Sequence, residues 1–191
     1  CSRIFQLLAK LWCIDQVAGI RQTLRRDSEE AAAKVGIKWP NDIVVDGKKV
    51  CGILTEMSME QGYIQHIVIG VGINVRKQEF PEEIRDRAAA IDEQCGFRIS
   101  RSQLTADIME AFEEDYEIFL RTHDLKGLRA SYAELLVNQD REVCVLDPKG
   151  EYRGIARGIN DQGELIVERQ DGTVEEVYAG EVSVRGIYGY V

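Results

Sequence analysis

The sequence is poor in histidine and in long apolar runs, and each shortage narrows the functions that the chain can have. Its 191 residues include only two histidines, His66 and His123, which excludes a histidine-rich metal site. No segment reaches the roughly 18 consecutive apolar residues that a membrane-spanning helix needs, so we expect no membrane partner. No glycine-rich phosphate loop precedes a helical pattern, and no spacing brings a Ser/His/Asp or Cys/His group together.

Close cysteine pairs are also missing. The five cysteines are scattered, odd in number and without a short repeated spacing, which favours reduced thiols over a disulfide framework or a zinc site. The formal net charge of −9 argues against a general nucleic-acid binder, because such proteins rely on basic contacts to phosphates. The composition therefore predicts a cytoplasmic protein that binds no nucleic acid through this chain.

The first 75 residues contain a helical pattern followed by short strands. Apolar residues from Ile4 to Ala18 follow the three-four spacing of an amphipathic helix. Asp46-Gly47 is the strongest hairpin signal in the chain, and Gln61-Gly62 predicts a second turn. Strands are predicted around these turns at 35–38, 42–46, 49–57 and 66–75.

Three further helices are predicted after the strands. Pro81 fits the first turn of a short helix, because proline is favoured at the first helical position. Ser100 and Gln103 fit a capping box at the start of a helical stripe that runs to Phe119. The last helix of this group is predicted near 125–136.

From residue 139 onward the apolar period changes to two, and turns recur. Five short strands in roughly fifty residues favour a small barrel, because a flat sheet of that size would expose its edges. We therefore predict an α+β fold in two domains. Residues 1–138 would form a mixed β-sheet with helices on one face, and residues 139–191 the barrel.

The predicted strand 66–75 has an unusual face. Because strand side chains alternate, Gly70, Gly72 and Asn74 share one face, while the apolar side chains between them share the other. Glycine inside a strand often marks the close approach of a ligand or of another backbone. A flat ring could lie on this bare floor with Asn74 reading its hydrogen-bonding edge. A helix packed against the glycines is the competing interpretation.

Lys49 begins an apolar strand beside the hairpin turn. Lysines beside turns are usually solvated, but this one lies three residues before Gly52 in a strand apolar enough to be buried. Such a cation could hold a carboxylate against a phosphate, and one contact at about 4 Å is worth up to roughly 4 kcal/mol before desolvation. Lys49 and Gly52 have opposite strand parity, so either Gly52 contributes backbone or the strand twists. Asn41 and Asp42 follow Pro40 in what is otherwise an ordinary turn.

Three segments occur in an order and at a spacing that are specific when taken together. They are Lys38-Trp39-Pro40-Asn41-Asp42, Lys49-Val50-Cys51-Gly52-Ile53-Leu54 and Gly70-Val71-Gly72-Ile73-Asn74. In these segments the chain resembles the biotin protein ligases, the enzymes that attach biotin to carboxylase carrier proteins. Gly154–Ile159 and Gly180–Arg185 also look like the small SH3-like barrel at the carboxy terminus of that family.

The resemblance implies an ATP-binding ligase that carries out protein biotinylation in two steps. The carboxylate of biotin attacks the α-phosphate of ATP, with Mg²⁺ assisting, and gives biotinyl-adenylate and pyrophosphate. A lysine of the biotin carboxyl carrier protein, an acetyl-CoA carboxylase subunit, then attacks the mixed anhydride. Lys49 would bridge carboxylate and phosphate, and Asp42 would orient the incoming lysine. The implied ligand-binding residues are Lys49, Asn41, Gly52, Leu54, Gly70, Gly72, Asn74 and Arg185, with no residue implied as a metal ligand.

Two family features that precede these motifs do not occur in the sequence. They are the arginine- and glycine-rich loop that closes over the adenylate and an upstream Ser/Thr-Asn turn that binds biotin. Because the sequence also opens with Cys1 rather than Met, we expect a partial catalytic domain without its amino-terminal half, with weak or no adenylate synthesis. Three other functions stay open: a non-catalytic relic or binding module, a lipoate-type acyl ligase, and a transcription factor with a DNA-binding module upstream. A homodimer is also open.

Overall fold

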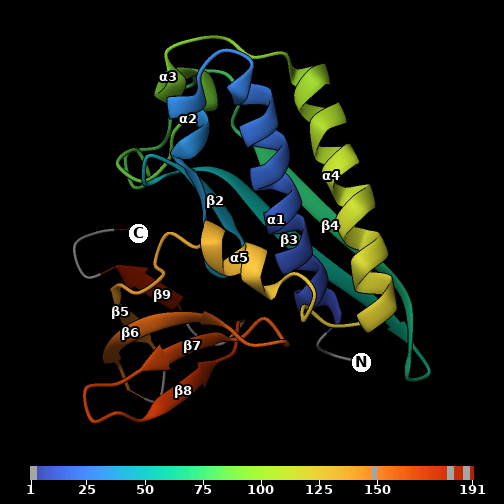
Figure 1. Ribbon diagram of the computed structural model, residues 1–191, viewed down its shortest axis with the longest axis vertical. Helices are drawn as coiled ribbons and strands as arrows, with labels where there is room; N and C mark the ends of the chain where they lie inside the picture. The colour runs from blue at the N-terminus through green and yellow to red at the C-terminus, as the bar shows by residue number, and fades with distance from the viewer. Residues whose placement is uncertain (1–3, 148–149, 180–182, 187–189) are drawn as a thin grey trace.

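A helical layer covers one sheet, and a second, smaller sheet curls beside them (Figure 1). The computed structural model describes residues 4–147, 150–179, 183–186 and 190–191. Gly180–Val182, part of the second barrel motif, and Cys1 lie outside these ranges. The α+β class with a small barrel is confirmed.

The larger sheet is built from two hairpins in the order β1-β2-β3-β4. Positive φ angles at Asp46 and Gly47, and again at Gln61 and Gly62, form the two predicted turns. The named strands pair antiparallel, and parallel pairing is limited to isolated bridges such as that between Ile37 and Leu136. The strands are β1 Val35–Lys38, β2 Asp42–Val45, β3 Lys48–Glu60 and β4 Tyr63–Ile73.

Helix α1 packs on one face of this sheet, and α4 lies along the outer side of α1 (Figure 1). Of the side chains at the predicted three-four spacing, Leu7, Leu11 and Ile14 are buried and the others are part-buried. The helix continues seven residues beyond the predicted end at Ala18 to Arg25. On the opposite sheet face, Leu54 and Val68 are 62% and 52% exposed. The sheet therefore has one packed and one open face. The helices are α1 Ile4–Arg25, α2 Glu29–Ala33, α3 Ile91–Cys95, α4 Arg101–Thr122 and α5 Arg129–Leu135.

One of the predicted helices does not form, and another begins where it was predicted. No helix is assigned after Pro81, where residues 82–87 form consecutive turns. This segment runs beside β3 instead, with the amide of Lys49 donating to the carbonyl of Arg87 at 2.7 Å. Ser100 caps this helix, since the amide of Gln103 donates to its hydroxyl at 3.3 Å. The reciprocal half of the predicted capping box does not form, because the Gln103 side chain donates to Asp107 at 2.9 Å.

The second sheet has the strand order β8-β7-β6-β5-β9, with antiparallel pairing throughout its named strands. Its apolar side chains alternate inward, as the period of two predicted. Within the described residues no helix is long and apolar enough to cross a membrane, and the four cysteines there are free thiols. The strands are β5 Glu142–Leu146, β6 Tyr152–Ile159, β7 Leu165–Glu168, β8 Val174–Val177 and β9 Ser183–Gly186.

Candidate active site

A β-bulge brings Lys49 to the open face of the sheet. Asp42 pairs with Gly52, but the register then shifts so that Val44 pairs with Lys49, which leaves Val50 as an extra residue. Lys49 and Gly52 therefore share a face, despite their spacing of three. A Cβ built on Gly52 would lie 3.0 Å from the Lys49 Nζ, so the ammonium lies directly above this glycine. The bulge resolves the parity conflict in the sequence.

Three glycines form a strip without side chains beside this ammonium. Gly52 pairs with Gly72, and Leu54 pairs with Gly70, so all four residues share the open face. Among the described residues, the atoms within 4 Å of a Cβ built on Gly70 or Gly72 are backbone carbonyl oxygens, at 3.7 and 4.0 Å. No helix fills the space above them, which removes the competing interpretation of the glycines. The sheet offers a flat backbone surface to a ligand.

The Asp42 carboxylate lies at the end of this strip, and both of its oxygens have partners. Lys49 Nζ lies 2.5 Å from Oδ1, and the Tyr190 hydroxyl donates to Oδ2. The ring of Tyr190 also makes a cation–π contact with a second ammonium, that of Lys38, whose Nζ lies 4.4 Å from the ring centroid. One carboxylate, two ammonium groups and a phenol thus form a connected cluster.

A cavity of about 450 Å³ opens above the cluster and reaches Asn74. Lys49, Asp42 and Asn74 all line it. The sequence motifs predicted that residues of one site would lie together in this way. Phe80 and Ile84, from the segment that follows β4, add apolar walls, and neither was predicted. Their signal in the sequence is weak, because the segment has no regular period. The remaining lining residues are Arg87, Ala88 and Tyr190.

Asn41 and Leu54 lie at a different hollow, of about 270 Å³, between the sheet and the start of α1. The Asn41 side-chain amide donates to the carbonyl of Ile53 at 2.6 Å, which ties the turn to β3. Asn74 is more accessible, and its Oδ1 accepts from Gln78 at 3.0 Å. The structure therefore brings Asn74 to Lys49 and gives Asn41 a contact within the fold.

Arg185 is exposed on β9, outside the residues that line the cavity. Its charge acts on Lys38: burial lowers the pKa of Lys38, Asp42 opposes this, and the nearby charges of Lys49 and Arg185 lower it further. Burial also raises the pKa of the Cys51 thiol, next to Gly52, to about 12. The site is therefore rich in positive charge and poor in competing nucleophiles.

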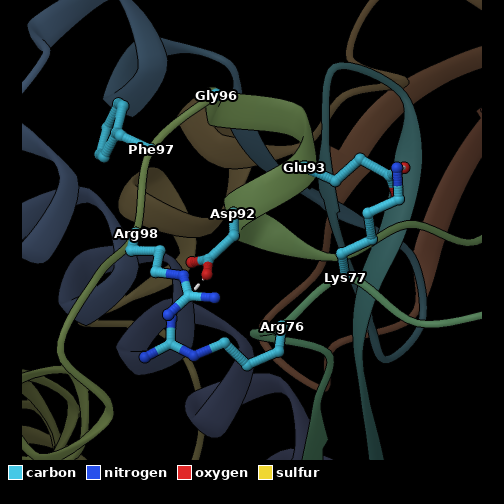
Figure 2. A pocket seen from close by; sticks show the side chains of 7 residues that line it. All are labelled: Arg76, Lys77, Asp92, Glu93, Gly96, Phe97 and Arg98. Carbon is cyan, nitrogen blue, oxygen red and sulfur yellow. Dashed lines mark hydrogen bonds and ion pairs between the residues drawn. The ribbon is translucent and has the colours of Figure 1, made fainter.

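A larger hollow, of about 550 Å³, lies near α3, and Figure 2 shows its charged side chains turned toward one another. Arg76 pairs with Asp92 at 2.6 Å, and Lys77 with Glu93 at 3.4 Å. Four of the five charged side chains that line the hollow are thus paired with one another, so we assign no ligand to it.

Nothing in the described ranges fits a magnesium ion held by the protein. No group of three or more His, Cys, Asp or Glu side chains is placed there to hold a metal. Asp42, the carboxylate of the site, already has partners on both oxygens. Magnesium often binds through substrate phosphates with few protein ligands, so an ion brought in by a nucleotide needs no such group.

The fold and the site define a class of protein: an α+β domain that presents a cation beside a bare glycine strip, joined to a small β-barrel. Residues 3–74 match the biotin/lipoate A/B protein ligase family, and residues 140–185 match the biotin protein ligase C terminal domain. Solved structures agree. The apo biotin protein ligase from Aquifex aeolicus superposes with a TM-score of 0.75 at 27% identity, over 96% of this chain and 77% of that one.

The chain belongs to the biotin protein ligase family. It is 34% identical over 159 residues to the bifunctional ligase/repressor BirA of Bacillus spizizenii, covering 81% of this chain and 48% of that protein. It is 32% identical over 151 residues to the biotin--[acetyl-CoA-carboxylase] ligase of Mycobacterium tuberculosis, covering 78% and 53%. The chain thus spans about half the length of these curated relatives.

Proposed function

We propose that this chain carries the lysine-bearing part of a site that activates biotin with ATP and transfers it to a carrier-protein lysine in the cytoplasm. The observation that carries the proposal is the position of Lys49. Its ammonium lies over Gly52 at the end of the bare strip, in one cavity with Asn74. The Aquifex aeolicus relative with 27% identity has been solved with biotin and ATP, at a TM-score of 0.72 over 96% of this chain and 74% of that one.

In the first step, an oxygen of the biotin carboxylate attacks the α-phosphorus of ATP. The new O–P bond forms as the bond from the α-phosphorus to the bridging oxygen breaks, and pyrophosphate leaves with the electron pair. Lys49 would exchange Asp42 for the two reacting anions, which reduces their mutual repulsion as they approach. Gly52, Gly70 and Gly72 would leave room for the ring system of biotin, and Asn74 would bind adenine beside Phe80.

In the second step, the amine of the carrier lysine attacks the acyl carbon of the adenylate. An amide bond forms, the acyl C–O bond breaks, and AMP leaves as the phosphate anion. Asp42, freed from Lys49 by the ligand, would orient the incoming ammonium and accept its proton. Arg185 would reach the nucleotide from the barrel.

Lys49→Ala tests this proposal. In a complete version of the protein, pyrophosphate release on adding biotin and ATP should fall at least about a hundredfold, as when one preorganised charge-stabilising donor is removed. The melting temperature should change by only a few degrees, because the Lys49–Asp42 pair is part-exposed and such pairs stabilise weakly. Lys48→Ala, which removes the exposed neighbouring ammonium, is the matched control and should keep wild-type activity. Equal losses of activity and stability in Lys49→Ala would assign the lysine a structural role.

The second candidate is a module that binds biotin without activating it. Titration calorimetry with biotin, lipoate and ATP separates the alternatives. Biotin binding with no pyrophosphate release would support the binding module, and tighter binding of lipoate would support a lipoate-type acyl ligase.

A further inference from the structure

We propose that Tyr190 is a positioning residue for the transfer step: its hydroxyl holds the Asp42 carboxylate so that the other carboxylate oxygen faces the cavity. The inference rests on the proposed function. The sequence motifs gave Tyr190 no role, and it lies 148 residues from Asp42 along the chain.

The geometry divides the two oxygens of Asp42 between different partners. Oδ2 accepts from Tyr190, a neutral donor, while Oδ1 is 2.5 Å from Lys49 Nζ, a charge that an anionic ligand would attract away. Burial and the hydrogen bond to Asp42 raise the pKa of the Tyr190 hydroxyl, so it remains a donor at every pH the protein works at. When Lys49 turns to a bound phosphate, Tyr190 keeps the carboxylate in place, and Oδ1 becomes available to the carrier ammonium.

Tyr190 is itself held by packing on both sides. On one side, the Nζ of Lys38 lies 4.4 Å from the centroid of the Tyr190 ring. The adjacent Val191 packs against two glycines: its Cγ2 lies 3.2 Å from a Cβ built on Gly47, and its carbonyl oxygen would collide with a Cβ on Gly186 of β9. The hairpin turn and the barrel thus fix the position from which the hydroxyl reaches Asp42.

The test measures transfer from synthetic biotinyl-adenylate to a biotin carboxyl carrier domain, so that adenylate synthesis is not needed. Tyr190→Phe, which keeps the ring, should lower kcat for transfer at least fivefold and leave KM for the carrier domain unchanged. In an Asp42→Asn background the same substitution should have no further effect, because its action passes through Asp42. Tyr63→Phe removes a hydroxyl from a side chain that is 78% exposed and should match the wild type.

If the wild-type chain transfers biotin, three outcomes overturn the inference. They are an unchanged kcat in Tyr190→Phe, a faster transfer, which would make Tyr190 a plug, and an equal loss in the Asp42→Asn background. A wild-type chain that transfers no biotin overturns the proposed function and the inference with it. The melting temperatures of the wild type, Tyr190→Phe, Asp42→Asn and the double variant then show whether the contact forms at all, since coupled residues give non-additive shifts.

Discussion

At the scale of single residues, the site depends on side chains that are missing as much as on those present. Gly70 and Gly72 have only backbone atoms near their missing Cβ positions, so larger residues would fit there without collision. Folding therefore does not require glycine at either position. The bare strip is best explained by a ligand that lies on it when the site is occupied.

Gly70→Val separates binding from stability. The valine side chain would stand on the strip where biotin is proposed to lie, so calorimetry should show at least about tenfold weaker binding, or about 1.4 kcal/mol. The melting temperature should stay constant or rise, because β-branched residues favour strands and glycine disfavours them. His66→Val is the matched control, since position 66 lies on the same exposed face about 13 Å along the strand. Unchanged biotin affinity in Gly70→Val would move the ligand off this strip.

The sequence motifs pointed to residues that the structure brings together, but not to how they meet. Lys49, Asp42 and Asn74 were identified by motif, and all three line one cavity. Strand parity placed Lys49 and Gly52 on opposite faces, because a bulge cannot be recognised from alternation alone. Tyr190 was missed because its contact depends on how the barrel docks, and no local pattern reports that.

At the scale of elements, the α1–α4 contact contains an unusual buried acid. Asp15 on α1 is fully buried, and neither carboxylate oxygen has a hydrogen-bond partner within the described residues. Burial, reinforced by the Asp115 carboxyl on α4, raises the pKa of Asp15 to about 9. The predicted apolar stripe of this helix did not include position 15, so the sequence pattern did not point to a buried acid there.

Asp15 should make the fold less stable as the pH rises. Its carboxyl is protonated in the folded protein up to about pH 9 but ionises near its ordinary value of 3.8 when unfolded. The folded state therefore binds the extra proton between these values, and stability declines across that window. Asp15→Asn should raise the melting temperature at pH 8 by at least about 3 °C relative to the wild type, with a smaller difference at pH 5.

Differential scanning calorimetry at the two pH values checks this prediction. Asp27→Asn, at an exposed position after α1, serves as control and should change the melting temperature little at either pH. A difference between Asp15→Asn and wild type that is the same at pH 5 and pH 8 would contradict the prediction.

At the scale of the whole molecule, a buried hydrogen bond from Trp39 helps to join the barrel to the rest of the fold. Trp39 is 1% exposed, and its Nε1 donates to the carbonyl of Gly163 in the barrel at 3.1 Å. The amide of Leu125 donates to the neighbouring Asp161 carbonyl at 3.0 Å. Alternating patterns and turns predicted both domains, but contacts between them involve single residues that no periodicity marks.

Trp39→Phe should lower the free energy of unfolding more than Trp12→Phe does. Both changes remove the same atoms, but only Trp39 leaves a buried carbonyl without its donor, which costs about 1–3 kcal/mol. The Trp12 Nε1 has no partner among the described residues, and a phenylalanine there can still stack on Phe112. Urea unfolding followed by far-ultraviolet circular dichroism measures both. Equal losses would show that the bond to Gly163 adds nothing to stability.

Because Val50 is an extra residue in β3, the face of the sheet on which Lys49 lies depends on the number of residues in the hairpin, which composition does not show. A relative that kept every motif residue but lost one position between Val44 and Lys49 would restore regular pairing and turn its ammonium toward α1. Such a protein would look intact in a motif comparison while holding its charge inside the hydrophobic layer. In this family, counting residues across the hairpin is therefore as informative as identifying them.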